Sequence, residues 1–368
     1  MANLSEPLYM QIYNQLREDI LTLKYPAGSQ LPTEKELCDM FHVSRITSKN
    51  ALNILADDNL IVRVKGKGSF VSYNAKPQHE HTKNKQNVIG LILPAFDDIY
   101  GRDILAAVEK CCRENNYLCM FSRSGDNQNT EEQVIEKMVA FGVVGIIIMP
   151  MFGAYYNAKI LRLILDGFPV ITIDRNLRGI PSHFVGTDNI QAAETAMDYL
   201  IKCGHRKIGV YSAPIKHTST LEDRIEGINR SLHKHNLFLE PSLFFTQINS
   251  TLSQKNISEE LAKDKAALHE HITNNEGMTA AFALGYDIAL MLKQTIEAFH
   301  LSNLAIVCFD SPKCKFPESY QFTHIKQNQC EIAQKAFELL LSLINCNTNE
   351  KIHKINVKAS LICVDTHM

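Results

Sequence analysis

The segment LPTEKELCDMFHVSRITSKNALNILADDNLIVRVKGKGSFV, residues 31–71, determines the fold of the first part of the chain. Thr33 and Glu36 have the spacing of a capping box, so a short helix is expected to begin there. The residues HVSR follow, and Ser44 is a suitable N-cap for another helix. The residues expected to face inward are Leu37, Met40, Phe41, Ala51, Leu52 and Leu55. The pattern predicts two short helices that meet at a tight turn.

A small hairpin with a basic tip is predicted directly after these helices. In LIVRVKGKGSFV, residues 60–71, apolar and basic residues alternate and then give way to Gly66, Lys67 and Gly68. Glycines on both sides of a lysine suit a tight turn between two strands. No carboxylate occurs in residues 40–56 or 61–76. Positive charge is therefore concentrated on the third helix and the hairpin.

A helix before this segment and a linker after it complete a separate domain. Residues 8–24 place an apolar stripe at helical spacing, which consists of Leu8, Ile12, Leu16, Ile20 and Leu23. Residues 74–87, NAKPQHEHTKNKQN, contain no large apolar side chain and are typical of a linker. We expect a small α+β domain over residues 1–73, a linker over 74–87 and a larger domain over 88–368.

The sequence from Val88 onward changes to short apolar runs separated by amphipathic segments of helix length. The runs are VIGLILP, YLCMFSR, VVGIIIMP, PVITID, KIGVYSA, MTAAFAL and LAIVCFD. Alternation of strands and helices predicts an α/β fold, with parallel sheets covered by helices on both faces. Seven such strands in this length suit two lobes better than one.

Composition and missing motifs limit the possible functions. The formal net charge is -2, the ten cysteines include no CxxC pair, and no charged start precedes an apolar run. We expect a cytoplasmic protein without a membrane segment. The GxSxG, GxGxxG and HExxH patterns of common enzymes are absent, so we expect no enzyme, no cofactor and no metal site.

The first seventy residues resemble the winged helix-turn-helix of the GntR family of bacterial transcription factors. The string LPTEKELCDMFHVSRITSKNAL and the wing GKGSFV carry the resemblance, with Ser48 and Lys49 as departures from the usual residues. It implies binding of double-stranded operator DNA, by a homodimer on a two-fold symmetric site. The implied DNA-binding residues are Thr33, Glu34, Ser44, Arg45, Ile46, Thr47, Lys49, Lys65, Gly66, Lys67 and Gly68.

The remainder resembles the effector domain of the LacI family, which is similar to periplasmic sugar-binding proteins. The matching strings are VIGLILP, PVITIDR, CGHRKIGVYS, RIEG, VCFDS and IKQN. The resemblance implies a sugar or sugar-derived effector in a cleft between two lobes. The implied ligand-binding residues are Tyr100, Ser122, Ser124, Asp174, Arg175, Arg224, Tyr286, Asp287, Asp310 and Gln327.

These residue types suit a sugar, because carboxylates accept hydrogen bonds from hydroxyl groups and arginine donates a forked pair. Most of them follow strands, where the loops of α/β sheets bind ligands. A structural role is an open alternative for each one, because an aspartate after a strand also caps helices. We expect a repressor of carbohydrate genes that a sugar releases. A sensor of a sugar phosphate or other metabolite, acting as a co-repressor, remains open, whereas an enzyme-fused regulator is disfavoured.

Overall fold

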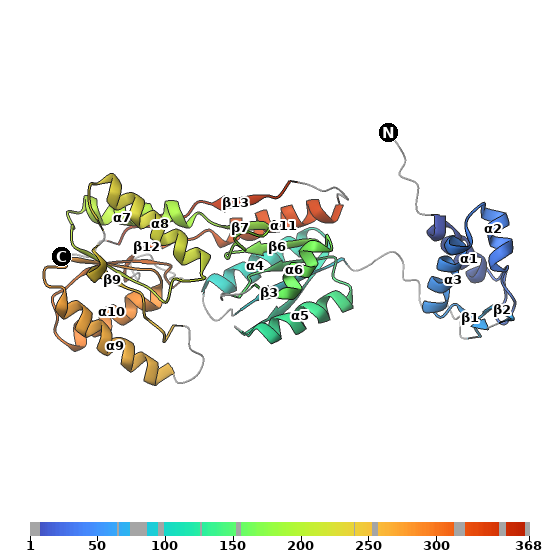
Figure 1. Ribbon diagram of the computed structural model, residues 1–368, viewed down its shortest axis with the longest axis horizontal. Coiled ribbons are helices and arrows are strands. Elements are labelled where there is room, and N and C mark those ends of the chain that lie inside the picture. The colour runs from blue at the N-terminus through green and yellow to red at the C-terminus, as the bar shows by residue number, and fades with distance from the viewer. Residues whose placement is uncertain are drawn as a thin grey trace. The chain divides into compact units, whose positions relative to one another are not determined.

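The computed structural model of the protein describes residues 8–64, 66–73, 87–94, 99–125, 127–151, 156–238, 240–251, 257–312, 321–345 and 351–364. The chain forms two compact units, within residues 1–85 and within residues 86–368 (Figure 1). The predicted linker, 74–87, lies outside the described residues except for Asn87. This residue begins a strand, so the linker prediction is wrong at that position.

The N-terminal unit is a three-helix winged fold. Its elements are α1 (Leu8–Leu21), α2 (Glu34–Phe41), α3 (Arg45–Asp57), β1 (Ile61–Val64) and β2 (Gly68–Val71). The two strands pair in antiparallel fashion, with Ile61 opposite Val71. The capping box of Thr33 and Glu36 is present at the start of α2. Side chains from all three helices and both strands share one core.

Three exposed residues belong to the predicted apolar stripe of the first helix or to the predicted inward face of the second. Leu8, Leu23 and Met40 have exposed fractions of 54%, 73% and 60%. Leu23 lies beyond the last residue of α1 and has a left-handed backbone, so the helical spacing does not extend to it. Met40 lies outside the face of α2 on which Leu37 is buried and Phe41 contacts the core. The prediction of these three positions is therefore wrong.

The C-terminal unit consists of two α/β lobes. Lobe 1 contains β3 (Asn87–Leu93), α4 (Ile99–Glu114), β4 (Tyr117–Arg123), α5 (Gln128–Phe141), β5 (Gly145–Ile148), α6 (Ala158–Leu165), β6 (Val170–Ile173), β7 (His183–Thr187), α11 (Gln329–Asn345) and β13 (Lys354–Val357). Lobe 2 contains α7 (Asn189–Lys202), β8 (Ile208–Tyr211), α8 (Ser219–Lys234), β9 (Phe244–Phe245), α9 (Ile257–Asn274), β10 (Ala280–Ala283), α10 (Tyr286–Ala298), β11 (Ala305–Phe309), β12 (Thr323–Lys326) and β14 (Ser360–Ile362).

Each lobe has a six-stranded sheet between two layers of helices. The strand orders are β13-β7-β6-β5-β3-β4 and β14-β12-β11-β10-β8-β9. Helices α4 and α11 cover one face of the first sheet, and α5 and α6 cover the other. Helices α7 and α8 cover one face of the second sheet, and α9 and α10 cover the other. Central strands such as β5 and β10 are apolar throughout because both of their faces are buried.

The seven predicted strands are β3, β4, β5, β6, β8, β10 and β11, and the prediction of parallel pairing holds for all of them. Only β14 pairs in antiparallel fashion within these two sheets, as far as the described strands show. Within the described residues, no helix is long and apolar enough to cross a membrane.

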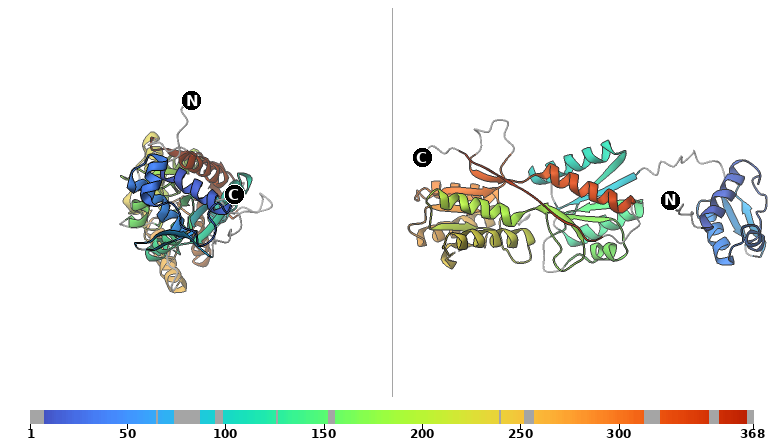
Figure 2. Two further views of the ribbon diagram at one scale, coloured as in Figure 1. Left: turned by 90° about the vertical axis from the view of Figure 1, so that its right-hand side faces the viewer. Right: turned by 90° about the horizontal axis from the view of Figure 1, so that it is seen from above.

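The chain passes between the lobes three times. It leaves lobe 1 after β7, returns after β12 and leaves again between β13 and β14. The view from above in Figure 2 shows the last of these crossings, drawn in red. As a result α11 packs in lobe 1, although it follows the strands of lobe 2. Segments that lie more than a hundred residues apart therefore meet at the junction of the lobes.

Candidate functional site

The start of α3 presents the first group of predicted DNA-binding residues. Ser44 caps this helix, because its hydroxyl accepts a hydrogen bond from the Thr47 backbone at 3.3 Å. The Ser44 and Thr47 hydroxyls lie 2.9 Å apart. Arg45 and Lys49 are exposed, on the first turns of the helix. The cap leaves both cations available at the surface of α3. The side chain of Ile46 lies outside the described part of the chain.

Thr33 and Glu34 are engaged within the N-terminal unit. The hydroxyl and backbone nitrogen of Thr33 both lie within hydrogen-bonding distance of the Glu36 carboxylate, at 2.9 Å and 2.7 Å. The Glu34 carboxylate pairs with Arg63 of β1, and Arg63 also donates to Asn53 of α3. These contacts attach the hairpin to the helices. Glu34 therefore forms an ion pair within the protein, in addition to the contact with DNA that the resemblance predicts.

The two departures from the family pattern have different structural settings. Ser48 is buried, and its hydroxyl donates to the carbonyl oxygens of Arg45 and Glu34 at 3.1 Å and 3.3 Å. The polar side chain is therefore satisfied inside the helical core. Lys49 lies on the exposed side of the same helix.

The wing is held at its turn by backbone contacts. The Lys67 nitrogen donates to the Val64 carbonyl at 3.0 Å, and the Gln30 side chain donates to the Lys67 carbonyl at 3.0 Å. Gly68 has a φ of 114°, and a side chain there would approach the Gln30 amide. Glycine is therefore required at the turn, and the Lys67 side chain is exposed. Lys65 lies outside the described residues.

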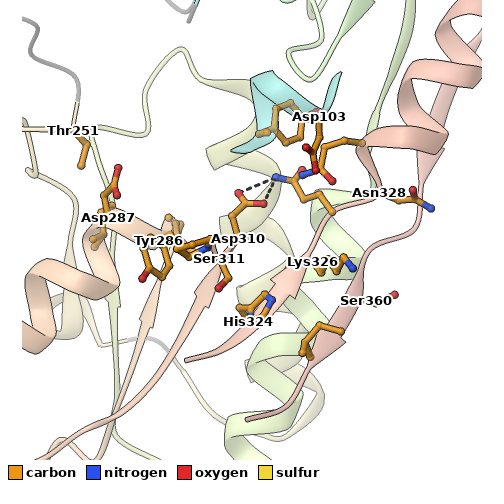
Figure 3. Close-up of a pocket in the computed structure, with 18 of the residues that line it drawn as sticks. Asp103, Thr251, Tyr286, Asp287, Asp310, Ser311, His324, Lys326, Asn328 and Ser360 are labelled. Carbon is orange, nitrogen blue, oxygen red and sulfur yellow. Dashed lines mark hydrogen bonds between the residues drawn. The ribbon is translucent and has the colours of Figure 1, made fainter. Parts of the chain in front are cut away.

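A cleft of about 1150 Å³ lies in the C-terminal unit. Five of the predicted ligand-binding residues line it, which are Tyr100, Tyr286, Asp287, Asp310 and Gln327. Tyr100 comes from α4 of lobe 1. Tyr286, Asp287 and Asp310 come from lobe 2, and Gln327 lies between β12 and α11. The cleft therefore collects residues that lie more than two hundred positions apart in the chain. Figure 3 shows Asp310 between Tyr286 on one side and Lys326 and Asn328 on the other.

Asp310 is held by Gln327 at the centre of this cleft. The Gln327 amide donates to both carboxylate oxygens of Asp310 at 3.0 Å (Figure 3). The carbonyl oxygen of the same side chain accepts from the Thr187 hydroxyl at 2.5 Å. Thr187 ends β7, so these bonds join Asp310 to two of the crossings between the lobes. The geometry orients the carboxylate before any ligand binds.

Asp174 and Asp310 occupy equivalent strand ends in the two lobes. Both have a left-handed backbone, with φ values of 61° and 63°. Aspartate tolerates this conformation better than most residues, and such positions concentrate at functional sites. Burial and the carboxylates of Asp174 and Asp310 raise the pKa of Tyr100 well above its ordinary value. The Tyr100 hydroxyl therefore stays protonated and can serve as a hydrogen-bond donor.

Arg224 is buried below the cleft and is engaged by protein groups. Its Nε donates to Asn189, and its Nη1 donates to the Leu284 carbonyl, both at 2.8 Å. The guanidinium lies 3.7 Å from the centre of the Phe309 ring. Burial lowers the pKa of Arg224, and Asp310 and Asp174 oppose this effect. Two of the donors expected to bind a ligand are thus already used.

Five predicted ligand-binding residues do not line the cleft, which are Asp174, Arg224, Ser122, Ser124 and Arg175. Ser122 lies inside β4 and not after it, because the strand extends to Arg123. Ser124 is fully buried, and its backbone nitrogen donates to Leu93. Arg175 donates to the Pro150 carbonyl at 2.8 Å and lies 3.8 Å from the Asp174 carboxylate. The end of β4 was therefore predicted too early, and the direction of the Ser124 and Arg175 side chains depends on contacts that the sequence does not display.

The cleft also contains polar residues that the sequence did not reveal, which are Asp103, Thr251, Ser311, His324, Lys326, Asn328, Gln329 and Ser360. Lys326 and Asn328 flank Gln327, so the IKQN string could have indicated them. Thr251 follows the short strand β9 and has no comparable signal. Within the described ranges, no group of three or more His, Cys, Asp or Glu side chains could hold a metal ion.

Comparison with protein families agrees with this architecture. Residues 8–71 match the bacterial regulatory proteins of the gntR family. Residues 89–286, more than half of the chain, match the periplasmic binding protein domain family. The chain belongs to this family. The periplasmic binding protein domain therefore follows a GntR-type helix-turn-helix, and both predicted resemblances are confirmed.

Proteins that are similar to this chain match either nearly all of it or about three quarters of it. The arabinose metabolism transcriptional repressor of Geobacillus stearothermophilus is 24% identical over 364 residues, which cover 97% of this chain and 96% of the relative. The transcription regulator CcpA of Lactococcus lactis is 20% identical, with a TM-score of 0.63 over 76% of this chain and 98% of its own. A LacI family regulator from Enterococcus faecium with bound ribose is also 20% identical, with a TM-score of 0.59 over 75% and 97%.

Proposed function

We propose that this protein is a transcription regulator that represses carbohydrate-utilisation genes in the cytoplasm and is released from its operator by a sugar. The main support is the presence in one chain of a cationic helix start beside a glycine wing and a polar cleft between two lobes. A relative that spans nearly the whole chain is named as an arabinose metabolism repressor. Relatives of the larger unit include a regulator described with bound ribose. We assign the chain no catalytic activity.

Operator recognition is assigned to α3 and the hairpin. Arg45 and Lys49 would enter a major groove, and Lys67 would contact the phosphates beside the wing. A single module of this kind buries only about 600–1,000 Å² of protein surface and binds weakly. We therefore propose a homodimer on a two-fold symmetric operator.

Release requires that the sugar bind unequally to two states of the larger unit. A coupling free energy of about 1–3 kcal/mol would change operator affinity roughly 5–150-fold. The same coupling requires that DNA weaken sugar binding by an equal factor. The contacts between Asp310, Gln327 and Thr187 connect the cleft to the crossings between lobes, so they support a link between occupancy and lobe geometry.

Selection of binding sites from random DNA, followed by fluorescence anisotropy, tests this function. Arg45→Ala should weaken binding to the selected operator by about 1–3 kcal/mol, whereas Lys67→Ala should weaken all DNA sequences similarly. Lys137→Ala removes an exposed lysine from α5 and serves as the control. Equal binding by all three variants would contradict the assignment of the DNA surface.

Addition of L-arabinose, D-ribose, cellobiose or their phosphates to the operator complex tests the effector. A lower operator affinity supports an inducer, whereas a higher affinity would identify a co-repressor. A response to the phosphates alone would favour a sugar-phosphate sensor. The second candidate function is therefore decided by the same titration.

A further inference from the structure

A set of polar contacts joins the two lobes on one flank of the C-terminal unit. Arg178 follows β6 of lobe 1, and its Nη1 lies 2.6 Å from the Glu222 carboxylate of α8 in lobe 2. The Nη2 of the same guanidinium pairs with Asp223. The Asn176 nitrogen donates to the Ser219 hydroxyl at 3.0 Å. We call the contacts of Asn176 and Arg178 with Ser219, Glu222 and Asp223 the lobe latch.

Partial burial strengthens this set of contacts. The side chains of Arg178, Glu222 and Asp223 have exposed fractions of 48%, 32% and 34%. Burial raises the pKa of Asp223, and the Arg178 charge opposes this rise. One guanidinium that binds two partly desolvated carboxylates forms charge-assisted hydrogen bonds, which are stronger than an exposed single pair.

The lobe 1 side of the latch is itself fixed. The Tyr156 hydroxyl donates to the Arg178 carbonyl at 2.9 Å, and Lys354 donates to the Asn176 side chain at 3.2 Å. The loop therefore cannot follow α8 if the lobes separate. Separation of the lobes must break the ion pairs of Arg178.

Both halves of the latch lie close in the chain to residues that line the cleft or adjoin its lining. Asp174, beside Tyr100, precedes Arg178 by four residues in the same loop. Leu221, which lines the cleft, and the buried Arg224 flank Glu222 and Asp223 on α8. We propose that Arg178 is a positioning residue, and that the lobe latch sets the equilibrium between closed and open lobes. This inference rests on the proposed function only in its consequence for sugar binding.

The latch contacts are made in the described arrangement, where Tyr100 of lobe 1 and Asp310 of lobe 2 line one cleft, and the proposal takes this arrangement as the closed state. If a ligand binds the closed state alone, its apparent affinity falls with the fraction of closed molecules. Loss of the latch should therefore weaken ligand binding without removal of any group that touches the ligand.

Hydrogen exchange of the full-length protein without ligand tests the latch directly. Arg178→Met keeps the length of the side chain and removes its charge. The matched control is Arg162→Met, because Arg162 of α6 pairs at 2.8 Å with Asp166, the residue directly after α6 in the same lobe. Arg178→Met should raise exchange several-fold in residues 175–180 and 219–223, including the Asn176 amide, which donates across the lobes. Equal exchange in these segments for both variants would overturn the proposal.

Calorimetric titration with the tightest binder among L-arabinose, D-ribose and cellobiose tests the consequence for the site. Arg178→Met should raise the dissociation constant about 3–10-fold, as expected for loss of a partly buried pair, with a smaller rise for Arg178→Lys. Sodium chloride at about 1 M, where the Debye length is about 3 Å, should weaken binding by the wild type more than by Arg178→Met. Unchanged affinity in Arg178→Met would overturn the positioning role.

Glu222→Gln keeps the proposal testable if Arg178→Met does not fold, and it should change exchange and affinity in the same direction. If exchange increases but no sugar binds the wild type, the latch is supported and the proposed sugar response fails. If sugar binds and neither Arg178→Met nor Glu222→Gln differs from Arg162→Met, the proposed function stands and the latch is refuted.

Discussion

The two lobes of the C-terminal unit have the same strand order but different chemistry. Numbered along the chain within each lobe, the strands lie in the order sixth, fifth, fourth, third, first and second. In both lobes an aspartate with a left-handed backbone follows the fourth strand, which is β6 or β11. Asp310 of lobe 2 lines the cleft, whereas Asp174 of lobe 1 does not. The shared architecture therefore positions both carboxylates, and the neighbouring side chains decide which of them faces a ligand.

The two lobes also contribute unequal numbers of residues to the cleft lining. Among the described lining residues, lobe 1 contributes Tyr100 and Asp103 of α4, together with Gln329 and Cys330 at the start of α11. Most others, including Leu284–Ile288 and Asp310–Pro312, belong to lobe 2 (Figure 3). We infer that lobe 2 provides most of the ligand specificity and that lobe 1 closes over it. The following predictions test this inequality, from the largest expected effect to the smallest.

The helix packing of lobe 2 should tolerate less change than the sheet of lobe 1. A methyl group at Gly227 of α8 would lie 2.1 Å from the Ile190 carbonyl of α7, whereas one at Gly90 of β3 would meet the flexible Met138 sulfur at 2.8 Å. Backbone cannot move aside as a methionine can. Gly227→Ala should lower the free energy of unfolding by about 3 kcal/mol, and Gly90→Ala by about 1 kcal/mol. Urea unfolding monitored by circular dichroism measures both, and equal losses would contradict the packing difference.

The two strand-end aspartates should differ in their effect on sugar affinity. Asp310→Asn should cost about 1.5–3 kcal/mol of binding free energy, because a charged acceptor for ligand hydroxyls is lost. Asparagine tolerates the same backbone conformation, so the strand end should keep its shape. Asp174→Asn is the matched control and should cost less than about 1 kcal/mol, because Asp174 lies outside the cleft lining. Calorimetric titration decides the matter, and a larger loss for Asp174→Asn would reverse the assignment.

Lobe 2 should lose stability first as the pH falls. Burial lowers the pKa of His205, His271 and His324, all in lobe 2. Each is therefore neutral in the folded state at a pH where the unfolded chain already binds a proton. Stability from these groups is complete above the ordinary histidine pKa of 6.5 and decreases as the pH falls below it.

His271 provides the clearest test, because it packs edge to face on the Tyr211 ring, with centroids 5.4 Å apart, and its Nδ1 lies 3.3 Å from the Tyr211 hydroxyl. Hydrogen exchange at about pH 7.5 and about pH 5.5 should show a larger loss of protection in lobe 2 than in lobe 1. His271→Gln should reduce that difference. An equal loss in both lobes, unchanged in the variant, would show that these histidines do not control the acid response.

The sequence by itself determined the architecture and the local structure of the helices and wing to which we assign DNA binding. The capping box at Thr33, the N-cap at Ser44 and the glycines of the wing are local signals, because their hydrogen bonds join residues close in the chain. Apolar runs identified the seven central strands because both faces of those strands are buried. Strand ends then located Asp174 and Asp310 without knowledge of their partners.

Only the tertiary structure decided which side chains meet. Gln327 joins Thr187, which lies 140 residues away, and Arg178 joins α8 of the other lobe. The same kind of distant contact attaches Arg224 to Leu284 and Asn189 and leaves Ser122 and Arg175 away from the cleft. The physical reason is that local propensity fixes elements and their ends, whereas side-chain partners depend on how the three crossings bring the lobes together.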